Sequence, residues 1–154
     1  MLSIDDLYLT HDEQQTLAET HPYNPLVQHR GQPSTHDVNL GIKLFESLRR
    51  RENQIKIPSY DKSAYQGQGE RREKSDWHVV NEDSSKRPVE VIIFEGWCVG
   101  FRPLSDDELE RKWREANSDV DDAQKEYNGR LGKLKLEDVK FVNKALKQYN
   151  DLTE

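Results

Sequence analysis

The sequence lacks the residues and segments on which several common kinds of protein depend. It has one cysteine, Cys98, in 154 residues, which excludes an intrachain disulfide framework and leaves no cysteine pair for a zinc site. Its five histidines form neither an HxH nor an HExxH pattern. No apolar run approaches the roughly 20 residues of a membrane span, and no signal peptide is visible. We therefore expect a cytoplasmic protein with no membrane partner.

An excess of positive charge is also missing. The formal net charge is −6 and the isoelectric point is near 5.4, whereas a nucleic-acid groove requires a basic face. The arginine clusters at residues 49–51 and 71–72 are short and interleaved with acids. We therefore expect no nucleic-acid partner.

Apolar residues are scarce for a self-sufficient α/β core. Hydrophobic residues make up 33% of the chain, charged residues 34%, and the mean hydropathy is −1.02. The length suits one domain, yet only one segment is typical of a central strand, whereas an open parallel sheet has about five or six strands. The sequence therefore predicts a single, partial α/β domain over residues 1–154.

The segment at residues 89–95 is that strand. It is a run of branched and aromatic residues after Pro88, and it ends in Glu95 and Gly96. This pattern predicts a strand buried on both faces of a parallel sheet, and we expect strands near residues 1–4 and 54–57 to flank it in parallel. An acid at such a strand end can meet a metal-bound phosphate. The alternative is an ordinary core strand whose acid faces solvent.

Helices are expected on both sides of this strand. Thr10 with Glu13 and Ser105 with Glu108 fit capping boxes, and Thr35 or Asp37 can cap a helix with an apolar stripe. The four expected helices span about residues 10–19, 37–51, 105–117 and 136–152. Residues 59–88 are polar and contain glycines, which predicts a long loop or a β-hairpin excursion, and loops of that length are usually functional or disordered.

Four motifs occur in a fixed order along the chain. They are Ser-Ile-Asp-Asp-Leu-Tyr at residues 3–8, Arg-Gly-Gln-Pro-Ser-Thr-His-Asp at 30–37, Ile-Pro-Ser-Tyr-Asp-Lys-Ser at 57–63, and Phe-Glu-Gly-Trp at 94–97. In this order they resemble the D-glycerate 3-kinase group, in the P-loop kinase branch that also holds uridine kinase and phosphoribulokinase. The resemblance covers residues 1 to about 152. It implies a partial P-loop NTPase-like fold with a doubly wound, mostly parallel sheet, a glycerate-like acceptor, and ATP with Mg²⁺ as cofactors.

The resemblance implies a catalytic pair of acids. Asp5 falls on the acid that accepts the proton of the attacking hydroxyl, and Glu95 matches the strand-end acid near Mg²⁺ and its waters. From the residues alone, an acid in a turn is the better interpretation of Asp5, and only the resemblance reverses this. We expect these two acids, with Asp37 and Tyr60, to meet in one cleft at the carboxyl ends of the strands.

The same resemblance points to residues that bind the acceptor. Asp37 matches an acid that bonds a substrate hydroxyl, although it can also cap a helix. Tyr60 and Asp61 match a Pro-x-Tyr-Asp motif that lines the acceptor pocket, although the pattern is also typical of a surface turn. To these we add Arg30, whose guanidinium fork suits a carboxylate unless it is an ordinary surface arginine. His36 is expected to border the same cleft.

The sequence departs from the family at the nucleotide site. A P-loop kinase requires G-x-x-x-x-G-K-[ST], and this chain has no such segment; its nearest imitation, at residues 129–134, has the wrong glycine spacing and ends in Leu134. No cofactor-binding residue can therefore be assigned. Family members carry the P-loop upstream of the Ser-x-Asp motif and continue past the last helix into a strand and a basic lid. The sequence thus resembles an internal fragment of such a kinase.

Three functional hypotheses remain open. The first is an ATP-dependent kinase that phosphorylates D-glycerate, inactive as this truncated chain. The second is a non-catalytic remnant that binds a metabolite or a protein. The third is an incompletely folded fragment whose exposed apolar edge at residues 91–93 promotes association. The sequence does not indicate an oligomeric state.

Overall fold

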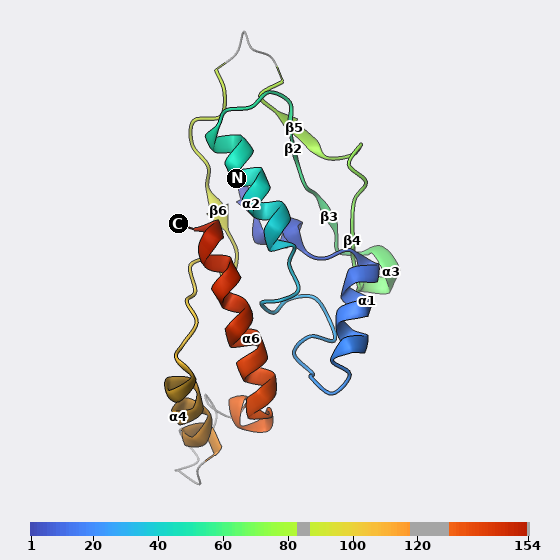
Figure 1. Ribbon diagram of the computed structural model, residues 1–154. Coiled ribbons are helices and arrows are strands. Elements are labelled where there is room, and N and C mark those ends of the chain that lie inside the picture. The colour runs from blue at the N-terminus through green and yellow to red at the C-terminus, as the bar shows by residue number, and fades with distance from the viewer. Residues whose placement is uncertain (83–86, 118–129, 154) are drawn as a thin grey trace.

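The computed structural model describes residues 1–82, 87–117 and 130–153, which form a mixed α/β arrangement (Figure 1). The helices are α1 (His11–Thr20), α2 (Val38–Arg49), α3 (Ala64–Gly67), α4 (Asp106–Asn117) and α6 (Leu136–Tyr149), with 3₁₀ turns η1 (Ile4–Leu7), η2 (Leu131–Lys133) and η3 (Asn150–Leu152). The strands are β1 (Leu2–Ser3), β2 (Ile55–Ile57), β3 (Tyr60–Asp61), β4 (Glu70–Arg71), β5 (His78–Val80) and β6 (Phe94–Glu95). Within the described ranges, no helix combines the length and apolarity that crossing a membrane requires.

The helix starts at Thr10 and Ser105 follow from local hydrogen bonds. The Thr10 side chain accepts the Glu13 N–H while the Glu13 carboxylate accepts the Thr10 N–H, which confirms the capping box of α1. At α4, Ser105 Oγ accepts the Glu108 N–H at 3.3 Å and donates to the Glu108 carboxylate at 3.2 Å. Both helix starts could be predicted from the sequence because these bonds join residues only three positions apart.

Asp37 caps α2. Its carboxylate accepts the Leu40 N–H at 2.9 Å, whereas the Thr35 hydroxyl accepts the Gly31 N–H at 2.9 Å and donates to the Gln32 carbonyl at 2.8 Å, both outside α2. The sequence left both residues open as caps, and the structure selects Asp37. The order of the elements therefore places the end of the Arg-Gly-x-Pro-x-Thr-His-Asp motif at the amino terminus of a core helix.

The first and last strands form the parallel part of the fold. Leu2 pairs with Phe94 and Ser3 with Glu95 in parallel register, and the Leu2 N–H donates to the Ile93 carbonyl at 2.8 Å. The expected parallel neighbour near residues 1–4 is therefore confirmed. This pair carries the carboxyl ends at which the sequence placed its catalytic acids.

The predicted strand at residues 89–95 is wrong in its extent and its burial. Strand geometry is confined to β6, and Val91 and Ile93 are 78% and 60% exposed. Ile92 and Phe94, by contrast, pack against the core. A continuous apolar run does not reveal whether its second face is covered, and the described residues cover one face only.

The prediction that the strand near residues 54–57 flanks β6 in parallel is also wrong. β2 pairs antiparallel with β5, and β3 pairs antiparallel with β4. Antiparallel neighbours need only a short return, whereas parallel neighbours need a crossover of a dozen or more residues. The polar stretch after β2 contains β3, β4 and β5, so the chain folds back on itself within it and makes no crossover. Its residues 83–86, like residue 129 of the imitation P-loop, lie outside the described ranges.

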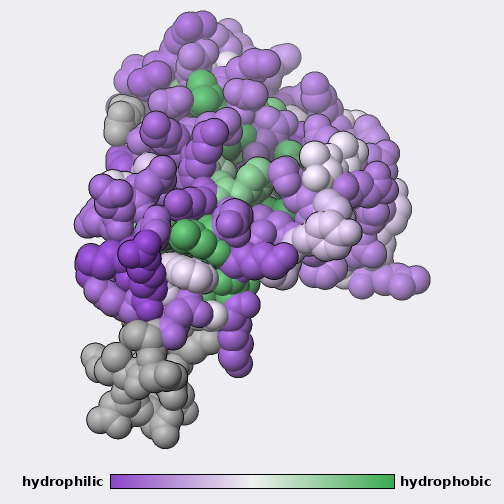
Figure 2. All heavy atoms as spheres, turned by 60° about the horizontal axis from the view of Figure 1, so that its bottom comes forward, coloured by the Kyte–Doolittle hydropathy of each residue, from purple (hydrophilic) through white to green (hydrophobic). Residues whose placement is uncertain are grey.

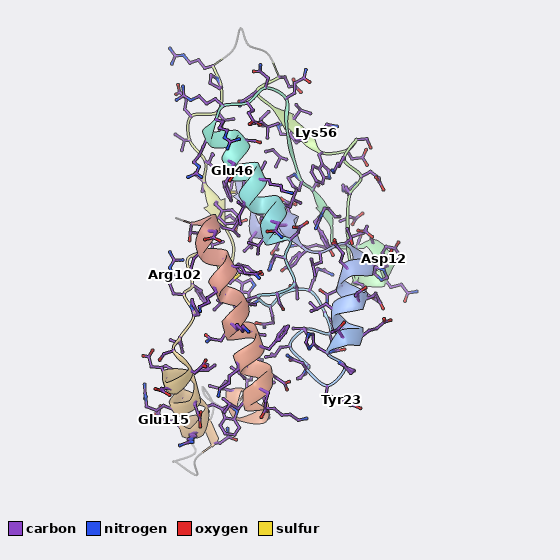
Figure 3. The ribbon with its side chains drawn as sticks, in the orientation of Figure 1. Asp12, Tyr23, Glu46, Lys56, Arg102 and Glu115 are labelled. Atoms are coloured by element: carbon purple, nitrogen blue, oxygen red, sulfur yellow. The ribbon has the colours of Figure 1, made fainter. Side chains whose placement is uncertain are left out.

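The core lies between α2, the strands and the end of α6. Phe45 on α2 contacts both buried clusters, and its ring meets that of Phe94 edge-on at 5.0 Å. One cluster contains Ile4, Val38, Cys98, Tyr149 and Leu152, and the other contains Leu44, Leu48 and Ile55. Figure 2 shows hydrophobic residues in a central strip bordered by hydrophilic ones, and Figure 3 shows Asp12 and Tyr23 pointing outward from α1 and the turn after it.

Gly96 allows the end of β6 to approach the turn after β1. Its φ of +150° is one that residues with a side chain rarely adopt, and a Cβ there would collide with the Ile4 side chain. Ile4 is fully buried. The glycine of the Phe-Glu-Gly-Trp motif therefore allows the strand end and the Asp5 turn to lie in contact.

Candidate functional site

Asp5 is presented by a short turn with an apolar anchor. In η1 the side chains of Ile4 and Leu7 are buried, with 0% and 2% exposure, so Asp5 and Asp6 are left on the polar side. The Asp6 carboxylate accepts the Tyr60 N–H at 3.1 Å. This bond joins the turn to β3 and brings the first and third sequence motifs together.

Asp5 lines an open cavity of about 510 Å³, here called the Asp5 cavity. Its walls come from η1, the loop after α1 and the segment around α3. The lining residues are Asp5, Tyr8, His29, Arg30, Lys62, Gln66, Gly67 and Gln68. A volume in this range suits a small molecule.

The Asp5 carboxylate has two polar partners in this cavity. Lys62 Nζ lies 2.6 Å from Asp5 Oδ2, and the Tyr8 hydroxyl interacts with the same side chain and lowers its pKa. Burial raises the pKa of Asp5, but the hydrogen bonds and the Lys62 charge outweigh it and hold this pKa below its usual value. The carboxylate is thus ionised at neutral pH. Burial and the Asp5 charge raise the pKa of Tyr8, so its hydroxyl keeps its proton.

Arg30 closes one wall of the cavity. Its guanidinium donates to the Gly67 carbonyl at 2.6 Å and to the Gln68 carbonyl, with a longer contact of 3.4 Å to the Lys62 carbonyl. It also lies 5.7 Å from the centre of the Tyr60 ring. Arg30 is therefore in the cavity, as expected, but its fork already holds the backbone of the α3 segment.

Tyr60 and Asp61 stand behind the lining residues. The Tyr60 ring meets the Tyr8 ring at 5.3 Å in an edge-on arrangement. The Asp61 carboxylate accepts the Ser63 N–H at 2.9 Å and the Ser63 hydroxyl at 2.6 Å. Asp61 therefore fixes the turn from which Lys62 projects.

His36 supports Tyr8 from the core side. The two rings stack at 4.4 Å with an interplanar angle of 22°, and His36 Nδ1 lies 2.7 Å from the Tyr149 hydroxyl. That hydroxyl also accepts the Ser34 N–H at 3.1 Å, and His36 Nε2 is buried without a hydrogen-bond partner among the described residues. Burial lowers the pKa of His36 to about 4. His36 is therefore neutral and buried; it packs against Tyr8 and does not line the cavity.

Asp37 supports the backbone of Tyr8 through Arg71. Besides capping α2, Asp37 forms an ion pair with Arg71 at 3.2 Å. The Arg71 guanidinium, 11% exposed, also donates twice to the Tyr8 carbonyl, at 2.8 and 3.2 Å. Asp37 thus acts behind the cavity and is absent from its lining.

Glu95 ends β6 beside the Asp5 turn. It is exposed and lies opposite Ser3 in the parallel register, and after burial and the Asp5 charge its own charge further raises the pKa of Asp6. Among the described residues, no three His, Cys, Asp or Glu side chains form a group that could hold a metal ion. The described residues therefore form no metal site built from protein ligands alone, whereas Mg²⁺ is usually held by one or two carboxylates together with waters and substrate phosphates.

The pairing of Asp5 with Lys62 was missed by sequence reasoning. The two residues are 57 positions apart, and no periodicity links them. Lys62 and Tyr8 both stand inside the motifs that carried the family resemblance, which was the available signal. In the sequence Arg71 belongs only to a short basic cluster, which gives no sign of its bonds to the Tyr8 carbonyl.

Three curated proteins are similar in sequence, and no family model matches. The chain is 47% identical over 103 residues to an uncharacterized kinase, mug58, of Schizosaccharomyces pombe, covering 66% of this chain and 36% of that protein. It is 39% identical over 109 residues to the chloroplastic D-glycerate 3-kinase of Arabidopsis thaliana, covering 69% and 23%. It is 36% identical over 107 residues to the probable ATP-dependent kinase TDA10 of Saccharomyces cerevisiae, covering 66% and 34%.

Two solved structures share the fold. A D-glycerate 3-kinase from Cryptococcus neoformans superposes with a TM-score of 0.78 at 34% identity, over 96% of this chain and 48% of that one. The YGR205w protein superposes with a TM-score of 0.67 at 32% identity, over 97% and 43%. The chain therefore spans less than half the length of the relatives it matches.

Proposed function

We propose that this chain, which is homologous to part of D-glycerate 3-kinase and related kinases, forms the acceptor side of a P-loop-type phosphotransferase. The reaction is transfer of the γ-phosphoryl group of ATP to a hydroxyl of D-glycerate. The homology supports the reaction class, and the Asp5 cavity supports the acceptor site.

One observation carries this proposal. An ionised carboxylate lies in a small-molecule-sized cavity, held between the Tyr8 hydroxyl and the Lys62 ammonium. In the proposed reaction the acceptor hydroxyl donates its hydrogen bond to Asp5. As the hydroxyl oxygen bonds to phosphorus and the bond to ADP breaks, its proton passes to that carboxylate. Orientation of the hydroxyl matters more than basicity in such a reaction, so a lowered pKa does not disqualify Asp5.

The other candidate residues take supporting roles in this proposal. Tyr60 forms part of the wall behind Tyr8, and Asp61 fixes the turn that carries Lys62. His36 and Asp37 hold Tyr8 by its ring and its backbone. Mg-ATP would supply the phosphoryl group, and Glu95, at the carboxyl end of β6, is the acid on this chain that would face its hydrated ion.

The isolated polypeptide is proposed to bind the acceptor without turning it over. The chain has no G-x-x-x-x-G-K-[ST] segment, whose backbone amides would bind the phosphates of ATP. Phosphoryl transfer depends on positioning those phosphates and neutralising their charge. The same absence favours the second candidate, a non-catalytic metabolite- or protein-binding module.

The test measures binding and turnover on one preparation. Calorimetry with D-glycerate is expected to detect saturable binding, and ADP release with D-glycerate and Mg-ATP is expected to remain at the blank rate. Turnover of about 1–100 s⁻¹ that is lost in Asp5→Asn would reject the inactive state. Failure to bind D-glycerate would reject the acceptor site and leave the protein-binding candidate.

A further inference from the structure

We propose that Lys62, and not Arg30, is the residue that recognises the carboxylate of the acceptor, so that the Asp5 cavity selects a hydroxy acid over a neutral polyol. The proposal rests on the proposed function, because it takes the Asp5 cavity as the acceptor site. It assigns specificity to a side chain that the sequence had not singled out.

Arg30 is already engaged by its own chain. Its guanidinium donates to the carbonyls of Gly67 and Gln68 and contacts that of Lys62, and its face lies over the Tyr60 ring. An acceptor that recruited Nη1 of this guanidinium would have to break bonds that hold the α3 segment. The backbone of that segment is strained, because Tyr65 and Gln66 adopt positive φ values of 49° and 58°. Such a backbone conformation persists only where the surrounding contacts fix it. Arg30 therefore shapes the cavity.

Lys62 keeps donors in reserve. An ammonium has three N–H donors, and the contacts of the described residues engage one of them, with Asp5 at 2.6 Å. The side chain is 59% exposed and lines the cavity. Lys62 can therefore bind an incoming carboxylate without releasing Asp5.

The charges around the cavity also require such a cation. Of the lining residues, Asp5 carries a negative charge and Arg30 and Lys62 carry positive ones, which together favour a monoanion. A carboxylate brought next to Asp5 would be repelled by it. An ammonium shared by the two carboxylates offsets that repulsion.

This arrangement matches the chemistry of a short hydroxy acid. In D-glycerate the carboxylate and the hydroxymethyl group that carries the terminal hydroxyl are attached to the same carbon. With the carboxylate on Lys62, the terminal hydroxyl is directed toward the neighbouring Asp5 carboxylate. Lys62 would thus set both the charge preference and the orientation of the acceptor.

An exposed ion pair with no functional part would give a different result. Exposed pairs contribute little to stability, so a purely structural Lys62 would treat charged and neutral ligands alike. The discriminating quantity is therefore the ratio of the dissociation constants for D-glycerate and glycerol, which differ in the carboxylate. NMR amide-shift titration of the full 154-residue chain measures both, because it tolerates weak binding.

We expect Lys62→Gln to weaken D-glycerate binding by about ten-fold to a hundred-fold, as for a lost charge-assisted hydrogen bond, and to leave glycerol within about two-fold. Lys62→Arg should restore part of the preference. The matched control is Lys144→Gln, an exposed lysine on α6 outside the cavity, which should change neither constant. Circular dichroism checks that each variant is folded.

The outcomes separate the two proposals. If the unmodified chain binds D-glycerate and Lys62→Gln changes both ligands equally or neither, the role of Lys62 is rejected and the acceptor site stands. If Arg30→Lys, rather than Lys62→Gln, selectively removes the preference for D-glycerate, carboxylate recognition belongs to Arg30. If the unmodified chain binds neither ligand, the proposed function fails, and the assignment of Lys62 fails with it.

Discussion

The Asp5 cavity and the segment at residues 89–101 differ in how their surfaces are covered. Around the cavity, the supporting side chains His36, Arg71 and Tyr149 hydrogen-bond to partners from separate segments of the chain. Along residues 89–101, large apolar side chains face outward. Val91, Ile93, Trp97 and Phe101 are 78%, 60%, 49% and 52% exposed.

The difference indicates which part of the fold is stabilised by its own contacts. The residues that would orient an acceptor are held by other described residues, so the cavity is a complete structural unit. The outer face of β6 and of the residues next to it is not covered by other described residues. An exposed apolar patch of this kind favours association with another molecule. Acceptor binding should therefore survive in this chain even where its stability is limited by the strand segment.

The contact between the two regions gives the largest expected effect. Gly96→Ala should lower the free energy of unfolding by about 4 kcal/mol, because the new methyl group meets Ile4 in a backbone conformation that favours glycine. Gly31→Ala is the matched control, since Gly31 has a similar φ of +141° and open space around it. Urea titration of both variants measures the difference. Equal losses would show that the two regions do not depend on this approach.

Because His36 is buried behind the Asp5 cavity, the free energy of unfolding should depend on pH. In the unfolded chain His36 takes up a proton near pH 6.5, whereas burial delays this to about pH 4 in the folded protein. Unfolding therefore binds a proton between these values, and stability falls as the pH falls, by about 3 kcal/mol in all. Denaturant midpoints of the wild type and of His36→Gln, measured between pH 4 and pH 6.5, give the contribution of His36 to the pH dependence of stability. The same slope in both would contradict a buried neutral His36.

Arg71 tests the backbone support of Tyr8. Arg71→Lys removes the two bonds to the Tyr8 carbonyl together with the fixed geometry at Asp37, and should cost about 2 kcal/mol. Arg72→Lys is the control, because Arg72 is half exposed and pairs with Asp61 at 3.4 Å; it should stay within about 0.5 kcal/mol. Thermal unfolding compares the two, and a neutral Arg71→Lys would mean that Tyr8 is held by its ring alone.

The smallest effect is expected on the open face of the strand segment. Val91→Ser should change stability by no more than about 0.5 kcal/mol, whereas Ile92→Ser, one residue along and packed on the core, should cost about 2 kcal/mol. Val91→Ser should also reduce concentration-dependent association, measured by analytical ultracentrifugation. A large loss at Val91 would mean that its face is covered.

Local features of the fold were easier to predict from the sequence than long-range ones. The helix starts at Thr10 and Ser105 depend on neighbours within a few residues, and the structure has them; the parallel pairing of β1 with β6 is the long-range feature that was also predicted. The antiparallel return of β2 and the exposure of Val91 depend on what lies across the sheet, which an apolar run does not encode. In the site, Asp5 and Arg30 were placed by motif, but the Lys62 partnership needed coordinates because it spans 57 positions.

The acceptor site is tested most directly by the pattern of backbone amide shifts when D-glycerate is added to the ¹⁵N-labelled chain. A site built around Asp5 predicts saturable shifts at residues 5–8, 62 and 66–68, weakened in Lys62→Gln, and no comparable shifts at residues 89–95. Saturable shifts centred on residues 91–101, or no saturable shifts at all, would contradict an acceptor site built around Asp5.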